Sequence, residues 1–146
     1  MLMYSIIKSA HSYFAWLAFA AIIIAVVIAL SSILGKKPFS TANLKMALWG
    51  LIAGHIQLLV GLLLYFLSPN GFHNLSGATM KDSAARLLAV EHPFINILAI
   101  IVITIGYSKA KKAISLGTAG KTVLIYYGIG LVLILSRIPW STWLNM

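Results

Sequence analysis

Three histidines lie within long apolar segments of this chain, where ionisable side chains are rare. His11, His55 and His92 each belong to a different segment. Ionisable groups inside membrane-spanning helices are costly and usually mark functional sites. A neutral imidazole binds transition metals and serves as an axial ligand of haem iron. We therefore expect the three histidines to converge on a metal or cofactor, the alternative for each being a hydrogen bond between helices.

The positions of these histidines predict a common depth in the membrane. With a helical rise of about 1.5 Å per residue, His11 lies about 12 Å and His92 about 15 Å from one end of the bundle. On the same scale His55 lies about 20 Å from that end. His73 is set apart, because it falls in a loop rich in Gly, Asn and Ser, where we expect it to be solvated.

Glycines surround His55 at helical spacing. Gly50 and Gly54 are four residues apart, and Gly61 follows two turns later. Such spacing favours close packing between membrane helices, which is the more common role of glycine there. The other interpretation is that the missing side chains leave room for a flat, bulky ligand beside His55. Gln57 could donate a hydrogen bond into such a pocket.

An acid, an imidazole and a proline follow one another in the third apolar segment. Pro93 has no backbone N–H, which frees the carbonyl of Ala89 from its helical hydrogen bond. We expect that carbonyl to accept from an imidazole N–H and so to set its tautomer. Glu91 could do the same for a histidine on a neighbouring helix.

Two arginines are candidates for binding the carboxylates of a haem. Arg86 and Arg137 lie toward the same ends of the third and fourth segments, and arginine binds carboxylates through two hydrogen bonds at once. The alternatives are an ion pair between Arg86 and Asp82, four residues earlier, and an Arg137 side chain that extends to lipid headgroups.

The composition identifies the elements that must position these groups as membrane-spanning helices. Of 146 residues, 61% are hydrophobic and 9% are charged, against roughly 25% charged residues in a soluble domain. The mean hydropathy is +0.98. The net charge of +9 sits in short loops, so we expect membrane topology rather than nucleic-acid binding to explain it. No cysteine is present, which excludes thiolate ligands and Cys-attached haem.

Four apolar segments are long enough to cross a bilayer, which takes about 20 residues. We expect spans over residues 5–34, 44–67, 82–107 and 121–138, with Asp82 as the N-cap of the third. The first is longer than the apolar region of a signal peptide and lacks a cleavage site after it. The prediction is a single domain, 1–146, with an all-α fold that forms a four-helix transmembrane up-down bundle.

The basic residues predict the orientation of the bundle. Seven lysines flank the two loops at one end, whereas the other end carries two lysines, two arginines and both acids. Because cytoplasmic loops are enriched in Lys and Arg, the end with seven lysines is expected in the cytoplasm. Both termini then face the outer, periplasmic side of a bacterial inner membrane.

Five segments spread over the chain carry a resemblance to a known family. They are HSYFAW at 11–16, HIQLLVGLLLYFLSP at 55–69, MKDSAARLLAVEHP at 80–93, IVITIGYSKAKKA at 101–113 and LSRIPW at 135–140. Together they resemble short four-helix membrane proteins labelled cytochrome-b-like. The first motif of that family is His-Ser-x-x-Arg-Trp, and this chain departs from it with Ala15 before Trp16. The resemblance implies a b-type haem with His11, His55 and His92 as candidate ligands.

The first functional hypothesis is thus a small membrane cytochrome or haem-bearing redox subunit, with other membrane redox subunits or a quinone as partners. The first and third helices of an up-down bundle are diagonal, so His11 and His92 could clamp a haem while His55 lines the pocket. Three alternatives remain: copper or zinc bound by the three histidines, an enzyme resembling membrane protoporphyrinogen oxidases, and a structural or assembly subunit. No P-loop, dinucleotide-binding or H-E-x-x-H motif is present.

Overall fold

The protein is an all-helical bundle. A computed structural model describes residues 2–143, and no β-strand forms within that range. Four helices are long and apolar enough to cross a membrane. The first two are α1 (Leu2–Leu34) and α2 (Thr41–Leu67), and the last is α6 (Ala119–Ser136). The third is a continuous run of α4 (Ser83–Arg86), a π-helical turn η2 (Leu87–Glu91) and α5 (His92–Ala113).

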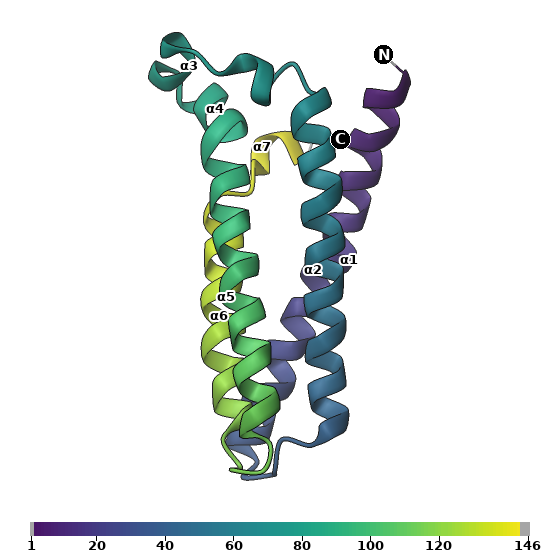
Figure 1. Cartoon of the computed structure of the whole chain (residues 1–146), viewed down its shortest axis with the longest axis vertical. Helices are drawn as coiled ribbons and strands as arrows, with labels where there is room; N and C mark the ends of the chain where they lie inside the picture. Colours follow the sequence, from purple (N-terminus) through teal and green to yellow (C-terminus); the bar gives the residue numbers. More distant parts are fainter. Residues whose placement is uncertain (1, 144–146) are drawn as a thin grey trace.

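Short elements lie at one end of these helices. The connection between α2 and α4 contains a 3₁₀ turn, η1 (Phe72–Asn74), and α3 (Gly77–Lys81). After α6 the chain forms α7 (Trp140–Trp143), which crosses between the two pairs of long helices in Figure 1. We call this end, which holds Leu2, the 68–82 connection and α7, the terminal end. The opposite end, with loops 35–40 and 114–118, is the lysine-rich end.

The helices alternate in direction, as the sequence predicts. α1 packs against α2 and α6, and α5 packs against α6 and α2. Helices α1 and α5 are therefore diagonal in the bundle (Figure 1). The predicted up-down four-helix bundle is confirmed.

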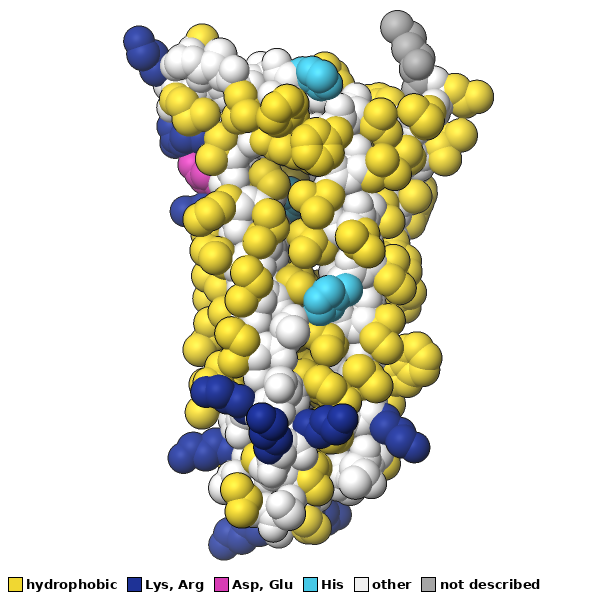
Figure 2. Space-filling model, in the orientation of Figure 1, with side chains coloured by type: hydrophobic (Ala, Val, Ile, Leu, Met, Phe, Trp, Pro, Cys, Tyr) yellow, Lys and Arg dark blue, Asp and Glu magenta, His cyan; other side chains and the backbone are white. Residues whose placement is uncertain are grey.

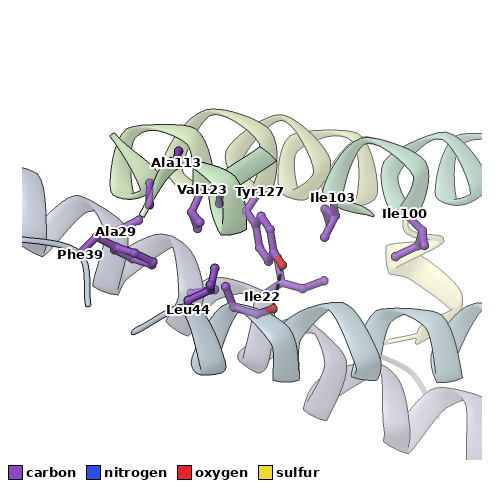
Figure 3. Close-up of a cluster of buried hydrophobic side chains, with 13 residues drawn as sticks. Ile22, Ala29, Phe39, Leu44, Ile100, Ile103, Ala113, Val123 and Tyr127 are labelled. Atoms are coloured by element: carbon purple, nitrogen blue, oxygen red, sulfur yellow. Dashed lines mark hydrogen bonds between the residues drawn. The ribbon is translucent and has the colours of Figure 1, made fainter. Parts of the chain in front are cut away.

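The packed core occupies the part of the bundle toward the lysine-rich end. In Figure 3, Val123, Tyr127 and Ile103 of α5 and α6 point toward Ile22 and Leu44 of α1 and α2. Small residues fill most of the remaining contacts: Ala25, Ala29, Ala47, Ala110, Ala113 and Ala119 are buried. The Tyr127 hydroxyl satisfies its hydrogen-bonding need by donating to the Ala47 carbonyl at 2.7 Å.

Glycines allow close helix contacts in this core. A Cβ added to Gly50 would lie 3.2 Å from the Ala21 carbonyl oxygen, and one added to Gly130 would lie 2.5 Å from Ile103 Cγ1. The packing interpretation of the glycine spacing is thus confirmed for Gly50.

The outer surface of the bundle is apolar, as a lipid-facing surface must be. Figure 2 shows hydrophobic side chains along the shaft and most Lys and Arg side chains near its lower end. The third long helix continues beyond the predicted span of 82–107, since α5 reaches Ala113 and carries Lys109, Lys111 and Lys112 on its last turns. Lys and Arg at a helix C-terminus interact favourably with the helix dipole, which explains the extension.

The start of the third span departs from regular α-helix. Asp82 caps it by accepting from the Ala85 N–H at 2.7 Å, which confirms the predicted N-cap. At the π-helical turn the His92 N–H reaches back to the Leu87 carbonyl. Such turns occur often at functional sites, and here the turn ends at Glu91, directly before His92 and Pro93.

Candidate functional site

A cavity of about 250 Å³ lies between the four long helices toward the terminal end, partly open to the surface. Most of its wall is apolar, with polar groups only at a few positions. Enclosed, mostly apolar sites with a few polar groups are typical of ligand and cofactor pockets. Its polar lining residues are Tyr4, Lys8, His11, Ser12, Gln57, Tyr65, Ser68, Asn70, His92, Asn96 and Thr142.

One stripe of α1 forms a wall of this cavity. Its members recur every three or four residues, which places them on one face of the helix. They are Tyr4, Lys8, His11, Ala15, Ala18 and Ile22. The side chains of this stripe are polar near the terminal end, small in the middle and large where the packed core begins. The cavity therefore exists because Ala15 and Ala18 leave space that larger side chains would fill.

Two of the three predicted histidines meet inside this cavity. The ring centroids of His11 and His92 are 6.3 Å apart, and the ring planes are nearly perpendicular at 87°. Both side chains line the cavity. The expectation that the diagonal first and third helices bring these two imidazoles together is thus met by the geometry.

The His92 ring is held by the connection after α6. Its Nδ1 lies 2.8 Å from the backbone carbonyl of Arg137. A carbonyl only accepts, so Nδ1 carries the proton and Nε2 keeps a free lone pair. Asn96, one turn later, donates to the His92 carbonyl at 2.7 Å. This is the arrangement of metal-binding histidines, in which a backbone carbonyl sets the tautomer.

The His11 ring is held by α2. The Gln57 side-chain amide donates to the His11 carbonyl at 2.9 Å and lies 3.2 Å from His11 Nδ1. Gly61 provides the space, because a Cβ there would lie 2.9 Å from His11 Cε1. Gln57 Oε1 is buried and has no hydrogen-bond partner within the described range. Gly54 also lines the cavity, and a Cβ there would lie 2.8 Å from Ile100 Cδ1.

His55 does not join the other two. It is exposed on the outside of α2, where its Nδ1 bonds to the Leu51 carbonyl of the same helix at 2.9 Å. The expectation that three imidazoles converge is therefore wrong for His55. Among residues 2–143, no group of three His, Cys, Asp or Glu side chains is placed to hold a metal ion.

The carbonyl freed by Pro93 has a partner other than the predicted one. The Ala89 carbonyl accepts from the Tyr65 hydroxyl at 3.0 Å. The prediction of an imidazole at this carbonyl is wrong because the π-helical turn places His92 toward the Arg137 carbonyl instead. As expected, the Ala89 carbonyl that Pro93 frees accepts a hydrogen bond from a side chain of another helix.

Glu91 joins the two predicted arginines. Its Oε1 lies 2.7 Å from Arg86 Nε and its Oε2 lies 3.1 Å from Arg137 Nε. Arg86 also donates to the Met80 carbonyl at 2.8 Å. The predicted alternative pair of Arg86 with Asp82 is wrong, because Asp82 caps α4. Neither arginine lines the cavity, and Glu91 does not contact an imidazole.

Polar residues at the mouth of the cavity were not among the candidates predicted from sequence. Tyr4, Lys8 and Asn70 line its end nearest the termini, and Asn96 lies beside His92. The helical spacing of Tyr4, Lys8 and His11 could have identified Tyr4 and Lys8, because it places them on the same face of α1 as His11. His73, predicted to be solvated, is exposed in η1 and bonds to the Phe66 carbonyl at 3.1 Å.

Comparisons with known protein families, with curated proteins and with solved structures gave no match to this chain.

Proposed function

We propose that this chain is a membrane cytochrome that binds one b-type haem between His11 and His92. One observation carries the proposal, the 6.3 Å separation of the two ring centroids inside the cavity. Metal–imidazole bonds are about 2 Å long, which puts the centres of two imidazoles on opposite sides of one metal atom roughly 6 Å apart. The perpendicular ring planes suit this arrangement, because each imidazole can rotate about its own bond to the metal.

The lining of the cavity supports a flat organic cofactor rather than a bare metal ion. Ala15 and Ala18 of α1 present little bulk toward the space beside the histidines. At about 250 Å³ the cavity is below the roughly 300–1,000 Å³ of typical ligand pockets. A porphyrin held by His11 and His92 would have to extend through the open side of the cavity or part the α1–α2 and α5–α6 pairs.

The protein groups around each imidazole have separate roles. The Arg137 carbonyl holds the His92 Nδ1 proton, which directs the Nε2 lone pair away from the backbone. The Gln57 amide holds the His11 backbone by donating to its carbonyl at 2.9 Å, and the same nitrogen lies 3.2 Å from His11 Nδ1. His11 and His92 would hold the haem, which would supply one-electron transfer.

The proposed orientation places this site near the outer side of a bacterial inner membrane. Seven lysines near the lysine-rich end support a cytoplasmic position for that end. Both termini and the cavity mouth are then periplasmic. Electrons would pass to other membrane redox subunits or to a quinone, and the bilayer surrounds the apolar shaft.

The test is an absorption spectrum of the detergent-purified protein, oxidised and reduced, for the wild type and three matched variants. We expect a Soret band in the wild type and in His55→Leu, which changes only the lipid-facing imidazole. His11→Leu and His92→Leu should each lose the low-spin bis-histidine spectrum while remaining folded. Wild-type protein that lacks haem even after reconstitution would overturn the proposal.

A structural subunit is the second candidate, because the contacts of His11 with Gln57 and of His92 with Arg137 also join helices. In that case His11→Leu and His92→Leu would lower the unfolding temperature, and no pigment would bind. Metal analysis of the same samples tests copper and zinc binding.

A further inference from the structure

We infer that Lys8 binds the carboxylates of the cofactor at the mouth of the cavity, which orients the porphyrin with its acidic edge toward the terminal end. This inference rests on the proposed function. From the sequence, Arg86 and Arg137 rather than Lys8 were the candidates for binding these carboxylates.

The positions of the two histidines set the plane of the ring. His11 and His92 come from the diagonal helices α1 and α5, so the line joining them runs across the bundle. A porphyrin lies perpendicular to the line through its two axial ligands. Its plane therefore runs along the helices, with one edge toward the terminal end and the opposite edge toward the packed core.

The two ends of the cavity differ in chemistry. Toward the core it is closed by Ile22 and Ile100. Toward the terminal end it is lined by Tyr4, Lys8 and Asn70. Burying an ionised carboxylate among isoleucines without a partner is strongly unfavourable, so the acidic edge belongs at the mouth.

Lys8 is the cation placed to meet that edge. It is the only lysine or arginine among the described residues that line the cavity. It precedes His11 by three residues, which puts its Cα about 4.5 Å nearer the terminal end on the same side of α1. No acidic side chain of residues 2–143 lies within ion-pair distance of it. By contrast, Arg86 and Arg137 are both paired with Glu91 outside the cavity.

The experiment compares two porphyrins in four proteins. Apoprotein in detergent is titrated with ferric protoporphyrin IX and with its dimethyl ester, which has the same ring but no carboxylates. The proteins are the wild type, Lys8→Gln, Lys8→Arg and Lys81→Gln, the last removing a lysine of α3 at the same end but outside the cavity. Thermal unfolding of each apoprotein checks that the fold is retained.

We expect the wild type and Lys81→Gln to bind the acid about tenfold more tightly than the ester, the effect of one hydrogen bond to a charged group. The ratio should fall close to one in Lys8→Gln and be retained in Lys8→Arg. Equal ratios in the wild type and Lys8→Gln would overturn the inference while leaving the haem proposal standing. Equal loss of both porphyrins in Lys8→Gln would overturn it too, and failure of the wild type to bind either porphyrin overturns both.

Discussion

The two halves of the bundle are built from the same four helices but use their facing side chains differently. Toward the lysine-rich end, alanines and a buried tyrosine bring all four helices into contact, and no buried polar side-chain atom there lacks a partner within the described range. Toward the terminal end, the same helices line a cavity that contains two imidazoles and an unpaired amide oxygen.

The comparison shows how a small bundle can hold a polar site in a membrane. Helix association in lipid depends on close packing of small residues rather than on the hydrophobic effect. The packed half supplies that association, and α7 closes the other half, with Trp143 stacked on Trp16 at 4.2 Å and donating to the Ser12 carbonyl. The cavity half therefore does not need to be closely packed for the bundle to assemble.

The strongest test of this division is a glycine substitution in the packed half. Gly106→Ala would place a Cβ far inside contact distance of Tyr126 Cβ, so we expect a loss of about 1–3 kcal/mol in stability. Gly128→Ala is the matched control, because nothing lies within 4 Å of its added Cβ. Thermal unfolding of the apoprotein in detergent measures both. Equal unfolding temperatures for the two variants would contradict the tight packing.

A glycine of the cavity half should behave in the opposite way. Gly61→Ala forces the His11 ring to move, because the added Cβ would lie 2.9 Å from its Cε1. We expect about tenfold weaker haem binding, the equivalent of roughly 1.4 kcal/mol, with little change in apoprotein stability. Gly128→Ala is the control, since it lies outside the cavity and nothing lies within 4 Å of its added Cβ. Titration of each apoprotein with haem measures the affinity. An affinity of Gly61→Ala equal to that of the wild type would argue against His11 as a ligand.

The smallest predicted effect concerns one hydroxyl group. Tyr127→Phe removes the buried hydrogen bond to the Ala47 carbonyl and should cost about 1 kcal/mol of stability. Tyr126→Phe, whose hydroxyl bonds to the exposed Lys109, should cost close to nothing. Neither should change haem affinity, because both lie outside the cavity. A weaker haem complex in Tyr127→Phe would show that the two halves are coupled.

The candidate site could be predicted in part. Residue spacing put His11 and His92 at similar depths, and the up-down topology made their helices diagonal, so their meeting follows from the sequence. The position of His55 was also accessible: Gly54, Gln57 and Gly61 share one face of α2 at helical spacing. His55, two residues before Gln57, falls on a different face, which the structure turns outward.

The partners of the charged residues could not be predicted in this way. Arg86 reaches Glu91 rather than Asp82 because η2 departs from α-helical spacing, and Arg137 reaches Glu91 from the connection after α6. The acceptor for His92 is a backbone carbonyl 45 residues away. Backbone acceptors have no sequence signature, so only the packing of α6 against α5 identifies this one.

By itself, the sequence determined the number of helices, the approximate limits of each span and the concentration of lysines at one end, because burial in lipid depends on the length and apolarity of each segment alone. Only the tertiary structure decided which face of each helix points inward. In a membrane bundle the lipid-facing and core-facing sides are both apolar, so the polar–apolar contrast that orients a helix in a soluble protein is weak. The rotation of each helix is set by how small and large side chains fit together, and that fit placed His11 and His92 inside and His55 outside.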